Sequence, residues 1–251
     1  MTVTVMKVSV ITATYNSSST VLDTLKSLSE QTYQNIEYII IDGGSSDNTL
    51  EVIKQQCPRV TTTISEPDKG IYDALNKGIN TATGDIIGFL HSDDLFAYPD
   101  AVKDIVDLFQ SSECQAVYAD LEYVSKSSTN KVVRLWKSGD YSRNKLKSGW
   151  MPPHPTFYMR RDLYEKYGVF DLSFKISADY DSLLRYLWGH DLKMSYLPKV
   201  LMKMRVGGAS NRNLKNIIQK SREDIRALKR SKLFWPRALL MKNLSKITQF
   251  L

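Results

Sequence analysis

Apolar and polar positions follow two alternating periods along the first 110 residues of the chain. Short apolar runs predict strands at Lys7–Thr12, Ile36–Ile41, Val60–Ser65 and Asp85–Leu90. Apolar residues at helical spacing predict helices between and after them, at Thr20–Gln31, Thr49–Gln56, Ile71–Thr81 and Tyr98–Gln110. Strands alternating with helices at this spacing are typical of an open α/β sheet. We therefore expect a Rossmann-like, mostly parallel sheet flanked by helices.

The pattern becomes less regular after Cys114. Strands are predicted at Gln115–Asp120 and Lys131–Lys137, a proline-rich loop at Gly149–Pro155 and a helix at Ala178–Gly189. From Asn213 onward, two basic helical segments are interrupted by Pro236. These changes divide the chain into a domain of residues 1–210, with halves 1–112 and 113–210, and a helical extension of residues 211–251.

Composition and charge narrow the class of protein. A chain of 251 residues with 42% apolar and 24% charged residues excludes a disordered or collagen-like protein. No apolar stretch approaches the ~18 residues that would span a bilayer, and the first residues do not have the pattern of a signal peptide. We expect a soluble, cytoplasmic chain. Residues 199–251 carry a net charge of +12, which leaves −5 for residues 1–198.

Aspartates gather where the predicted strands end. Ligands of open α/β sheets bind beyond the carboxyl ends of the strands, so the segments of interest are Thr12–Asn16, Asp42–Asp47, Ser65–Asp68 and His91–Asp94. Asp93 and Asp94 follow a buried strand directly, and paired carboxylates suit a hard divalent cation that also binds phosphate. The alternative is a turn whose aspartates cap the helix near Tyr98.

Four segments, taken together, carry a resemblance. Val8–Asn16, Ile41–Thr49, Asp68–Gly78 and Gly84–Asp94 resemble the successive blocks of family 2 glycosyltransferases, in the order that this family has them. The resemblance covers about the first hundred residues. It implies the glycosyltransferase A fold, transfer with inversion at the sugar carbon, and a requirement for Mg²⁺ or Mn²⁺. Residues 1–112 would then bind the nucleotide-sugar and residues 113–210 the acceptor.

The same resemblance implies roles for residues of the first half. Thr12, Ala13 and Tyr15 would contact the uridine of the donor and Asp42 its base. Asp93 would face the ribose, and Asp94 would bind the metal ion that bridges the donor diphosphate. Gly43 departs from the family pattern, which often has a second acidic residue there. Asp68 could share the contact with the base, or it could cap the helix that begins at Ile71.

The second half contains one further matching block, Phe174–Arg185. Asp179 matches the family's general base, whereas Ala178 takes the place of an acidic residue. The alternative for Asp179 is a helix cap, and Asp181 would point to a different face. His154, in the proline-rich loop, resembles a family segment near the acceptor. Its alternative is a role in loop packing.

These features together predict an inverting transferase that adds a single sugar. The donor would be a UDP-sugar, and the acceptor a saccharide linked to polyprenyl diphosphate in the synthesis of a bacterial surface polysaccharide, such as O-antigen, capsule or exopolysaccharide. One alternative is a sugar-nucleotide nucleotidyltransferase, but such an enzyme would have a basic, glycine-rich loop in place of Thr12–Asn16. The other is a catalytically degenerate protein that binds glycans or nucleotides.

The basic extension predicts a function of its own. Leu214, Ile217, Ile218, Ile225 and Leu228 form an imperfect apolar stripe with lysine and arginine around it. A basic amphipathic helix suits an anionic membrane surface, so we expect the protein to lie peripherally on the inner face of the cell membrane. We also expect the extension to be dispensable for activity on a water-soluble acceptor. The alternative is a helix packed on the domain, and the absence of a recognised motif argues against nucleic-acid binding.

Overall fold

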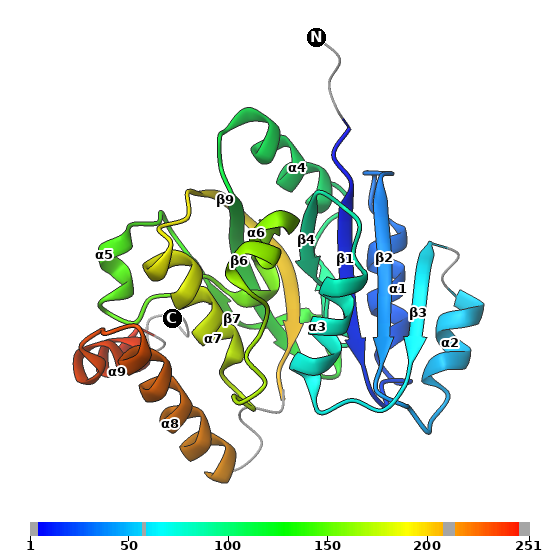
Figure 1. Ribbon diagram of the computed structural model, residues 1–251. Helices are drawn as coiled ribbons and strands as arrows, with labels where there is room; N and C mark the ends of the chain where they lie inside the picture. The colour runs from blue at the N-terminus through cyan, green and yellow to red at the C-terminus, as the bar shows by residue number, and fades with distance from the viewer. Residues whose placement is uncertain (1–4, 57–58, 208–213, 246–251) are drawn as a thin grey trace.

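The computed structural model describes residues 5–56, 59–207 and 214–245 of the chain (Figure 1). The strands are β1 (Val8–Thr14), β2 (Ile36–Asp42), β3 (Val60–Ser65), β4 (Ile86–Phe89), β5 (Leu95–Phe96), β6 (Ala116–Ser125), β7 (Ser128–Trp136), β8 (Tyr158–Arg160) and β9 (Met194–Arg205). The α-helices are α1 (Val21–Ser29), α2 (Thr49–Gln56), α3 (Ile71–Thr81), α4 (Ala101–Ser111), α5 (Arg143–Leu146), α6 (Arg161–Tyr167), α7 (Ala178–Leu184), α8 (Leu214–Arg230) and α9 (Trp235–Leu244). A 3₁₀ turn, η1, spans His154–Thr156, and a π-helical turn, η2, spans Arg185–Gly189. Cys57, Asn213 and Ile247 lie outside the described residues.

The strands in the described part of the chain form one sheet in the order β3-β2-β1-β4-β8-β6-β9-β5, with β7 paired to β6. The pairs among β3, β2, β1 and β4 are parallel, and so is the pair of β6 with β9. β8 is antiparallel to both of its neighbours. The prediction of an α/β sheet flanked by helices is confirmed, with a purely parallel first half and a mixed second half.

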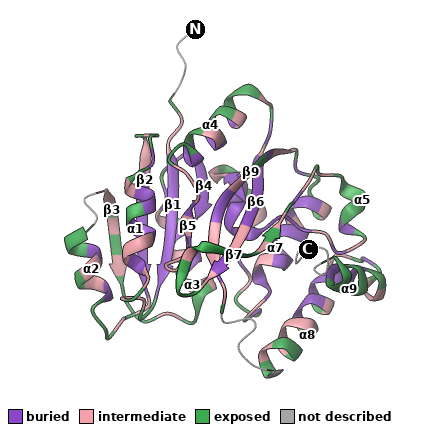
Figure 2. Cartoon of the chain, turned by 180° about the vertical axis from the view of Figure 1, so that it is seen from behind, coloured by how far each residue is buried: buried purple, intermediate pink, exposed green. Residues whose placement is uncertain are grey.

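The central strands are buried on both faces, as their continuous apolar sequences predict. Val8 and Val10 pack with α1, α2 and α4 in one hydrophobic cluster. Ile11 and Ala13 pack with α3, α6 and α7 in the other. Helices therefore cover both sides of the sheet, and Figure 2 shows buried strands between helices whose outer surfaces are exposed.

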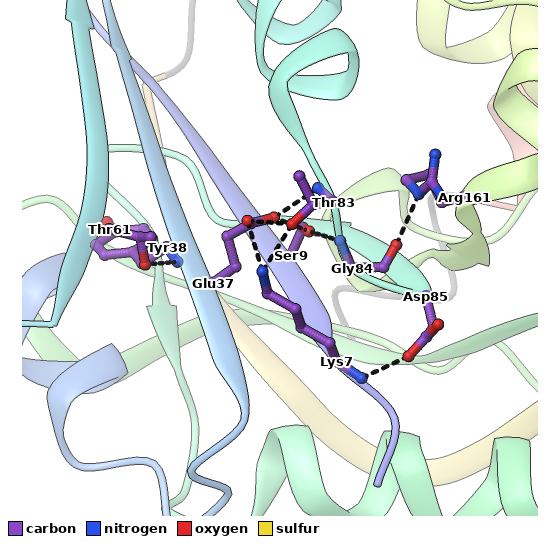
Figure 3. Close-up of polar contacts among 9 residues, drawn as sticks. All are labelled: Lys7, Ser9, Glu37, Tyr38, Thr61, Thr83, Gly84, Asp85 and Arg161. Atoms are coloured by element: carbon purple, nitrogen blue, oxygen red, sulfur yellow. Dashed lines mark hydrogen bonds and ion pairs between the residues drawn. The ribbon is translucent and has the colours of Figure 1, made fainter. Parts of the chain in front are cut away.

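A polar network fixes the amino ends of β1, β2 and β4, opposite to the edge where ligands are expected (Figure 3). Glu37 accepts hydrogen bonds from Lys7 Nζ (2.8 Å), the hydroxyl of Ser9 and the backbone N–H of Thr83 (2.8 Å). The N–H of Gly84 donates to Ser9 Oγ at 2.9 Å. A Cβ atom at Gly84 would lie 2.8 Å from the carbonyl oxygen of Lys7, so only glycine fits this close approach.

The strand β9 is the main element that the sequence pattern missed. It is twelve residues long, pairs along β6, and ends at Arg205. Its side chains alternate poorly between apolar and polar, and Pro198 lies within it. The short strand β5 follows β4 in sequence and pairs with β9, so β9 runs past the segment that contains Asp93 and Asp94.

The C-terminal helices α8 and α9 pack on the second half of the domain, residues 113–210. Ala227, Leu228, Leu233 and Ala238 belong to the same hydrophobic cluster as α7. The predicted apolar stripe is divided, because Leu228 is buried whereas Ile217 and Ile218 are exposed. The alternative of a helix packed on the domain is therefore confirmed for the inner face of α8. Within the described residues, no helix combines the length and apolar composition needed to cross a bilayer.

The network around Glu37 yields a stability prediction. Burial opposes ionisation of Glu37, but its bonds to Lys7, Ser9 and Thr83 lower the pKa to about 2. A lowered carboxyl pKa stabilises the fold above the unfolded value of about 4.3 and loses that effect as the pH falls toward 2. We expect Glu37→Gln to lower the free energy of unfolding at pH 7 by about 1–3 kcal/mol.

Urea unfolding at pH 7 and at acidic pH measures this effect. The gap between wild type and Glu37→Gln should narrow at acidic pH, whereas Glu30→Gln, at an exposed helix end, should match wild type throughout. A gap of constant size at both pH values would show that the charge of Glu37 is not the stabilising feature.

Candidate active site

The loops after β1 and β2 are tied together at the carboxyl edge of the sheet, the lower edge in Figure 1. Asn16 has a φ of 48°, a left-handed conformation that asparagine tolerates. Its backbone N–H donates to Ser45 Oγ at 2.8 Å, and its Oδ1 accepts from the N–H of Ser46 at 2.9 Å. Tyr15, one residue earlier, is exposed. The two loops thus form one surface, from which the ring of Tyr15 projects.

Thr12 and Asp42 lie beneath this surface rather than on it. Both are fully buried. The Thr12 hydroxyl donates to the carbonyl of Leu90 and shares a hydrogen bond with the Tyr38 hydroxyl at 3.0 Å. Asp42 accepts from the N–H of Ser45 (2.9 Å) and from Ser65 Oγ (2.7 Å), among other donors. Both side chains are therefore held by hydrogen bonds to the strands and loops around them.

Asp68 occupies the space that the missing side chain of Gly43 leaves. A Cβ atom at Gly43 would lie 2.4 Å from Asp68 Oδ2 and 3.5 Å from the ring of Tyr15. The other oxygen, Oδ1, accepts from the N–H of Gly70 at 2.7 Å. The carboxylate of Asp68 therefore stands beside Tyr15, in the place where the family pattern has its second acidic residue.

Asp94 is a buried carboxylate without a hydrogen-bond partner. The side chain is 1% exposed, and neither carboxylate oxygen is bonded. Its backbone is fixed instead, since its N–H donates to the carbonyl of His91 (3.0 Å) and Thr24 Oγ1 donates to its carbonyl (2.8 Å). Burial and the charge of Asp93 raise the pKa of Asp94 well above its usual range, and Arg205 opposes this shift. The capping alternative fails, because the N-cap of α4 is Asp100.

This arrangement fits a divalent cation. No group of three His, Cys, Asp or Glu side chains in the described part of the chain could hold a metal ion by itself. Mg²⁺ and Mn²⁺, however, are often bound through one or two carboxylates, with water and phosphate as the other ligands. The two unpartnered oxygens of Asp94 have the chemistry that such an ion requires. Asp94 is therefore the residue that would hold the metal, with Asp93 next to it.

Asp179 lies in the first turn of α7. Tyr72 Oη donates to the carbonyl of Ile176 at 2.6 Å and lies 3.2 Å from Asp179 Oδ1. Asp179 does not cap α7, whose N-cap is Ser177 without a side-chain capping bond. Asp181 is buried and lies 3.5 Å from the guanidinium of Arg230, so it points away from Asp179 as the spacing predicted.

His154 is buried against aromatic rings beside the same site. Its ring stacks on Phe89 with centroids 5.1 Å apart, and the ring of His91 is 6.3 Å away. Burial lowers the pKa of His154 to about 4, with Asp179 acting against the shift and His91 adding to it. The imidazole is therefore neutral at pH 7. The loop-packing alternative for His154 therefore has support, because its ring is buried and stacks on Phe89.

Sequence reasoning missed several residues of this site. Arg205, at the end of β9, donates to the carbonyl of Asp93 at 2.8 Å and pairs with the carboxylate of Asp23. His91 has a buried Nδ1 without a hydrogen-bond partner. His91 belongs to the segment Gly84–Asp94, and its position directly after a predicted strand could have indicated a site residue. Nothing in the local sequence indicates that Arg205 reaches back across more than a hundred residues.

Comparisons with known proteins identify related sequences. A family model described as Glycosyl transferase family 2 matches residues 9–168. An uncharacterized glycosyltransferase of Mycobacterium tuberculosis is 35% identical over 180 residues, which cover 71% of this chain and 68% of that protein.

Solved structures share the fold at low sequence identity. TarS 1-349 of S. aureus in complex with UDP-GlcNAc has a TM-score of 0.71 and 17% identity, with 94% of this chain and 70% of that chain covered. The mannosyltransferase PcManGT of Pyrobaculum calidifontis in complex with GDP-Man and Mn²⁺ has a TM-score of 0.66 and 18% identity, with 96% and 74% covered. This chain spans 44% of a longer TarS structure.

The unpartnered carboxylate generates a prediction about stability without metal. Asp94→Asn removes a buried carboxyl group whose ionisation is opposed by burial, so in EDTA the variant should be more stable than wild type by about 1 kcal/mol. Millimolar Mn²⁺ should stabilise wild type and leave the variant unchanged, because a ligand stabilises only the folded state that binds it.

Thermal unfolding in EDTA and in Mn²⁺ measures both effects, with Asp100→Asn as an exposed control. If Asp94→Asn melts at a lower temperature than wild type in EDTA, and Mn²⁺ does not raise the melting temperature of wild type, Asp94 is a turn residue and does not bind a metal ion.

Proposed function

This chain belongs to glycosyl transferase family 2, and we propose that it transfers a single sugar from a UDP-sugar to a hydroxyl group of a saccharide acceptor, with inversion at the sugar carbon. The observation that carries the proposal is the buried Asp94 carboxylate just after β4, neither oxygen of which has a hydrogen-bond partner. Such a carboxylate suits a divalent metal ion that also binds phosphate.

We assign the donor to the loops after β1, β2, β3 and β4. Ala13, Tyr15 and Asp68 would contact the uridine, with Thr12 and Asp42 holding those loops from below. Asp93 would face the ribose. The UDP-GlcNAc complex of TarS supports a uridine donor, although PcManGT binds GDP-Man, so a donor panel needs both nucleotides. Asp94 would hold Mn²⁺ or Mg²⁺, which neutralises charge on the departing diphosphate.

We assign the role of general base to Asp179. A hydroxyl group is a poor nucleophile, and a carboxylate within hydrogen-bond reach takes its proton as the new bond forms. The contact with Tyr72 orients Oδ1 of Asp179 and leaves Oδ2 for the acceptor hydroxyl. Attack from the face opposite the diphosphate inverts the sugar carbon, and the pair of electrons in the broken bond leaves with UDP. His154, neutral and beside Asp179, would lie near the acceptor.

Two alternatives lose support. Membership of the family favours glycosyl transfer over nucleotidyl transfer. A degenerate binding protein would have no need of an unpartnered buried carboxylate beside a second carboxylate. Incubation with UDP-sugars and GDP-mannose, Mn²⁺ and a lipid-diphosphate GlcNAc acceptor tests the proposal, and the anomeric configuration of the product tests inversion. Absence of transfer from every donor would support the binding protein instead.

We further propose that the acceptor is carried on polyprenyl diphosphate for a surface polysaccharide, and that the C-terminal helices contact an anionic membrane. Exposed apolar side chains lie along α9 and at its start, among them the N-cap residue Phe234 (72% exposed) and Leu240 (61%). Arg237 lies between them and is also exposed. Exposed aromatic and basic residues on one helix suit a lipid surface with anionic headgroups.

The role of Asp179 predicts a selective loss of turnover. Asn keeps the shape of Asp179 and cannot accept a proton, so Asp179→Asn should lower kcat by ~10²–10⁴-fold. Donor binding, measured by calorimetry with UDP and Mn²⁺, should change little. Asp181→Asn is the matched control, because Asp181 is on the same helix and faces Arg230. If activity survives Asp179→Asn and disappears in Asp181→Asn, the general base is Asp181 and not Asp179.

The membrane proposal predicts salt-sensitive sedimentation with vesicles. The protein should sediment with phosphatidylglycerol vesicles and not with phosphatidylcholine vesicles. Replacing Phe234 and Leu240 together by Ser should weaken binding at least about tenfold, because each large apolar side chain contributes about 1.5–3 kcal/mol when buried. Binding should also weaken at 1 M salt, where the Debye length is about 3 Å. Leu172→Ser, exposed elsewhere, is the control, and equal sedimentation of all variants would refute the docking role.

A further inference from the structure

Glu223, on the inner face of α8, binds the segment that leads into the helix of Asp179. Its Oε1 accepts from the backbone N–H of Lys175 at 3.0 Å. Its Oε2 accepts from the N–H groups of Ile176 (2.8 Å) and Ser177 (2.9 Å). Gln219, one turn earlier, donates to Oε1 at 3.0 Å. The Glu223 side chain is 8% exposed, so these charge-assisted bonds are formed largely out of water, where they are strong.

The bonds anchor the entry to α7. Ser177 is the N-cap residue of α7 and makes no side-chain capping bond. Glu223 accepts from the N–H of Ser177 and from the two N–H groups before it, so it fixes the chain where α7 begins. Its negative charge also lies close to a helix N-terminus, where it is favoured. Burial opposes ionisation of Glu223, but the bonds from Lys175 and Ile176 lower its pKa overall.

Other residues of α8 extend the contact on either side. The Arg226 guanidinium donates to Ser173 and lies 4.2 Å from the ring centroid of Phe174. Arg230 Nη1 donates to Asp171 Oδ2 at 2.7 Å. Positions 223, 226 and 230 share one face of a helix. That face of α8 therefore follows the chain from Asp171 to Ser177, immediately before Asp179.

One peptide unit, between Ile176 and Ser177, connects Glu223 to Tyr72 and Asp179. Its N–H, on Ser177, donates to Glu223. The carbonyl of Ile176 accepts from the Tyr72 hydroxyl, which also contacts Asp179 Oδ1. Glu223 and Tyr72 thus hold Ile176 from opposite sides, and the same tyrosine touches the carboxylate of Asp179.

We propose that Glu223 is a positioning residue for glycosyl transfer, which fixes Lys175–Ser177 so that Asp179 meets the acceptor hydroxyl. The inference rests on the proposed role of Asp179 as the base. A base displaced by about 1 Å can lose about 10²-fold in rate. The donor loops after β1, β2, β3 and β4 make no hydrogen bond to Glu223 among those found in the described residues, so donor binding should not depend on it.

Steady-state kinetics of three variants tests the proposal. Glu223→Ala should lower kcat by about 10- to 100-fold and keep the KM for the UDP-sugar within about twofold. Glu223→Gln, which keeps one acceptor oxygen, should recover part of the loss. Asp224→Asn is the matched control, because Asp224 is 4% exposed, is the next residue and binds Lys242 at 2.9 Å instead. It should lower the melting temperature and keep kcat within about threefold.

Hydrogen exchange followed by mass spectrometry gives a second measurement that needs no turnover. Exchange should accelerate over residues 171–181 in Glu223→Ala and stay unchanged there in Asp224→Asn. A folded Glu223→Ala with unchanged kcat overturns the proposal, and so does an equal loss in Asp224→Asn. If wild type transfers no sugar from any donor, the proposed function fails. In that case, unchanged hydrogen exchange over residues 171–181 in Glu223→Ala would show separately that Glu223 does not fix this segment.

Discussion

The burial of the Asp94 carboxylate without a partner is the constraint that shapes the rest of the site. Burying a charged group costs free energy unless a cation or hydrogen-bond donors compensate it. If the carboxylate oxygens are to stay available to a metal ion, other contacts of the turn must offset this cost. The surrounding residues meet that requirement by holding the backbone. Thr20, the N-cap residue of α1, donates to the carbonyl of Ser92, and Thr24 within α1 donates to that of Asp94. Arg205 donates to the carbonyl of Asp93. The turn is therefore rigid while its carboxylate stays available to a metal ion.

The first half of the fold was predictable because its signals are local. A strand buried on both faces has a continuous apolar sequence, and a helix such as Ile71–Thr81 shows its period within eleven residues. The end of such a strand also identifies Asp94 without any knowledge of its neighbours. The second half depends on pairing between distant segments. β9 is a strand because β6 and β5 bond to it, and its own sequence alternates too weakly to show this. Arg205 and Glu223 belong to the site for the same reason, since each acts on residues far away in the chain.

The net charge of residues 199–251 does not show how the individual charged side chains of the C-terminal helices are placed. Fourteen basic residues stand against Glu223 and Asp224 between Lys199 and Leu251, and the net charge directed attention to the outer, basic surface. The fold buries both acidic residues, together with Arg205 and Lys242. Asp224 pairs with Lys242, whose Nζ lies 3.4 Å from the ring centroid of Tyr180. Two adjacent carboxylates in a basic helix were the available signal that this helix has an inner face with polar partners.

Because of that inner face, the expectation that the extension is dispensable for activity on a water-soluble acceptor finds no support in the structure. α8 contributes hydrogen bonds to the segment before Asp179 on one side and exposes Ile217 and Ile218 on the other. A truncation would remove both sides at once, and a loss of activity on a membrane-bound acceptor could then come from either. Single substitutions separate them, because the inner bonds of Glu223 and the outer side chains of α9 share no residue. The C-terminal helices thus pack on the rest of the fold through one surface and expose another to solvent.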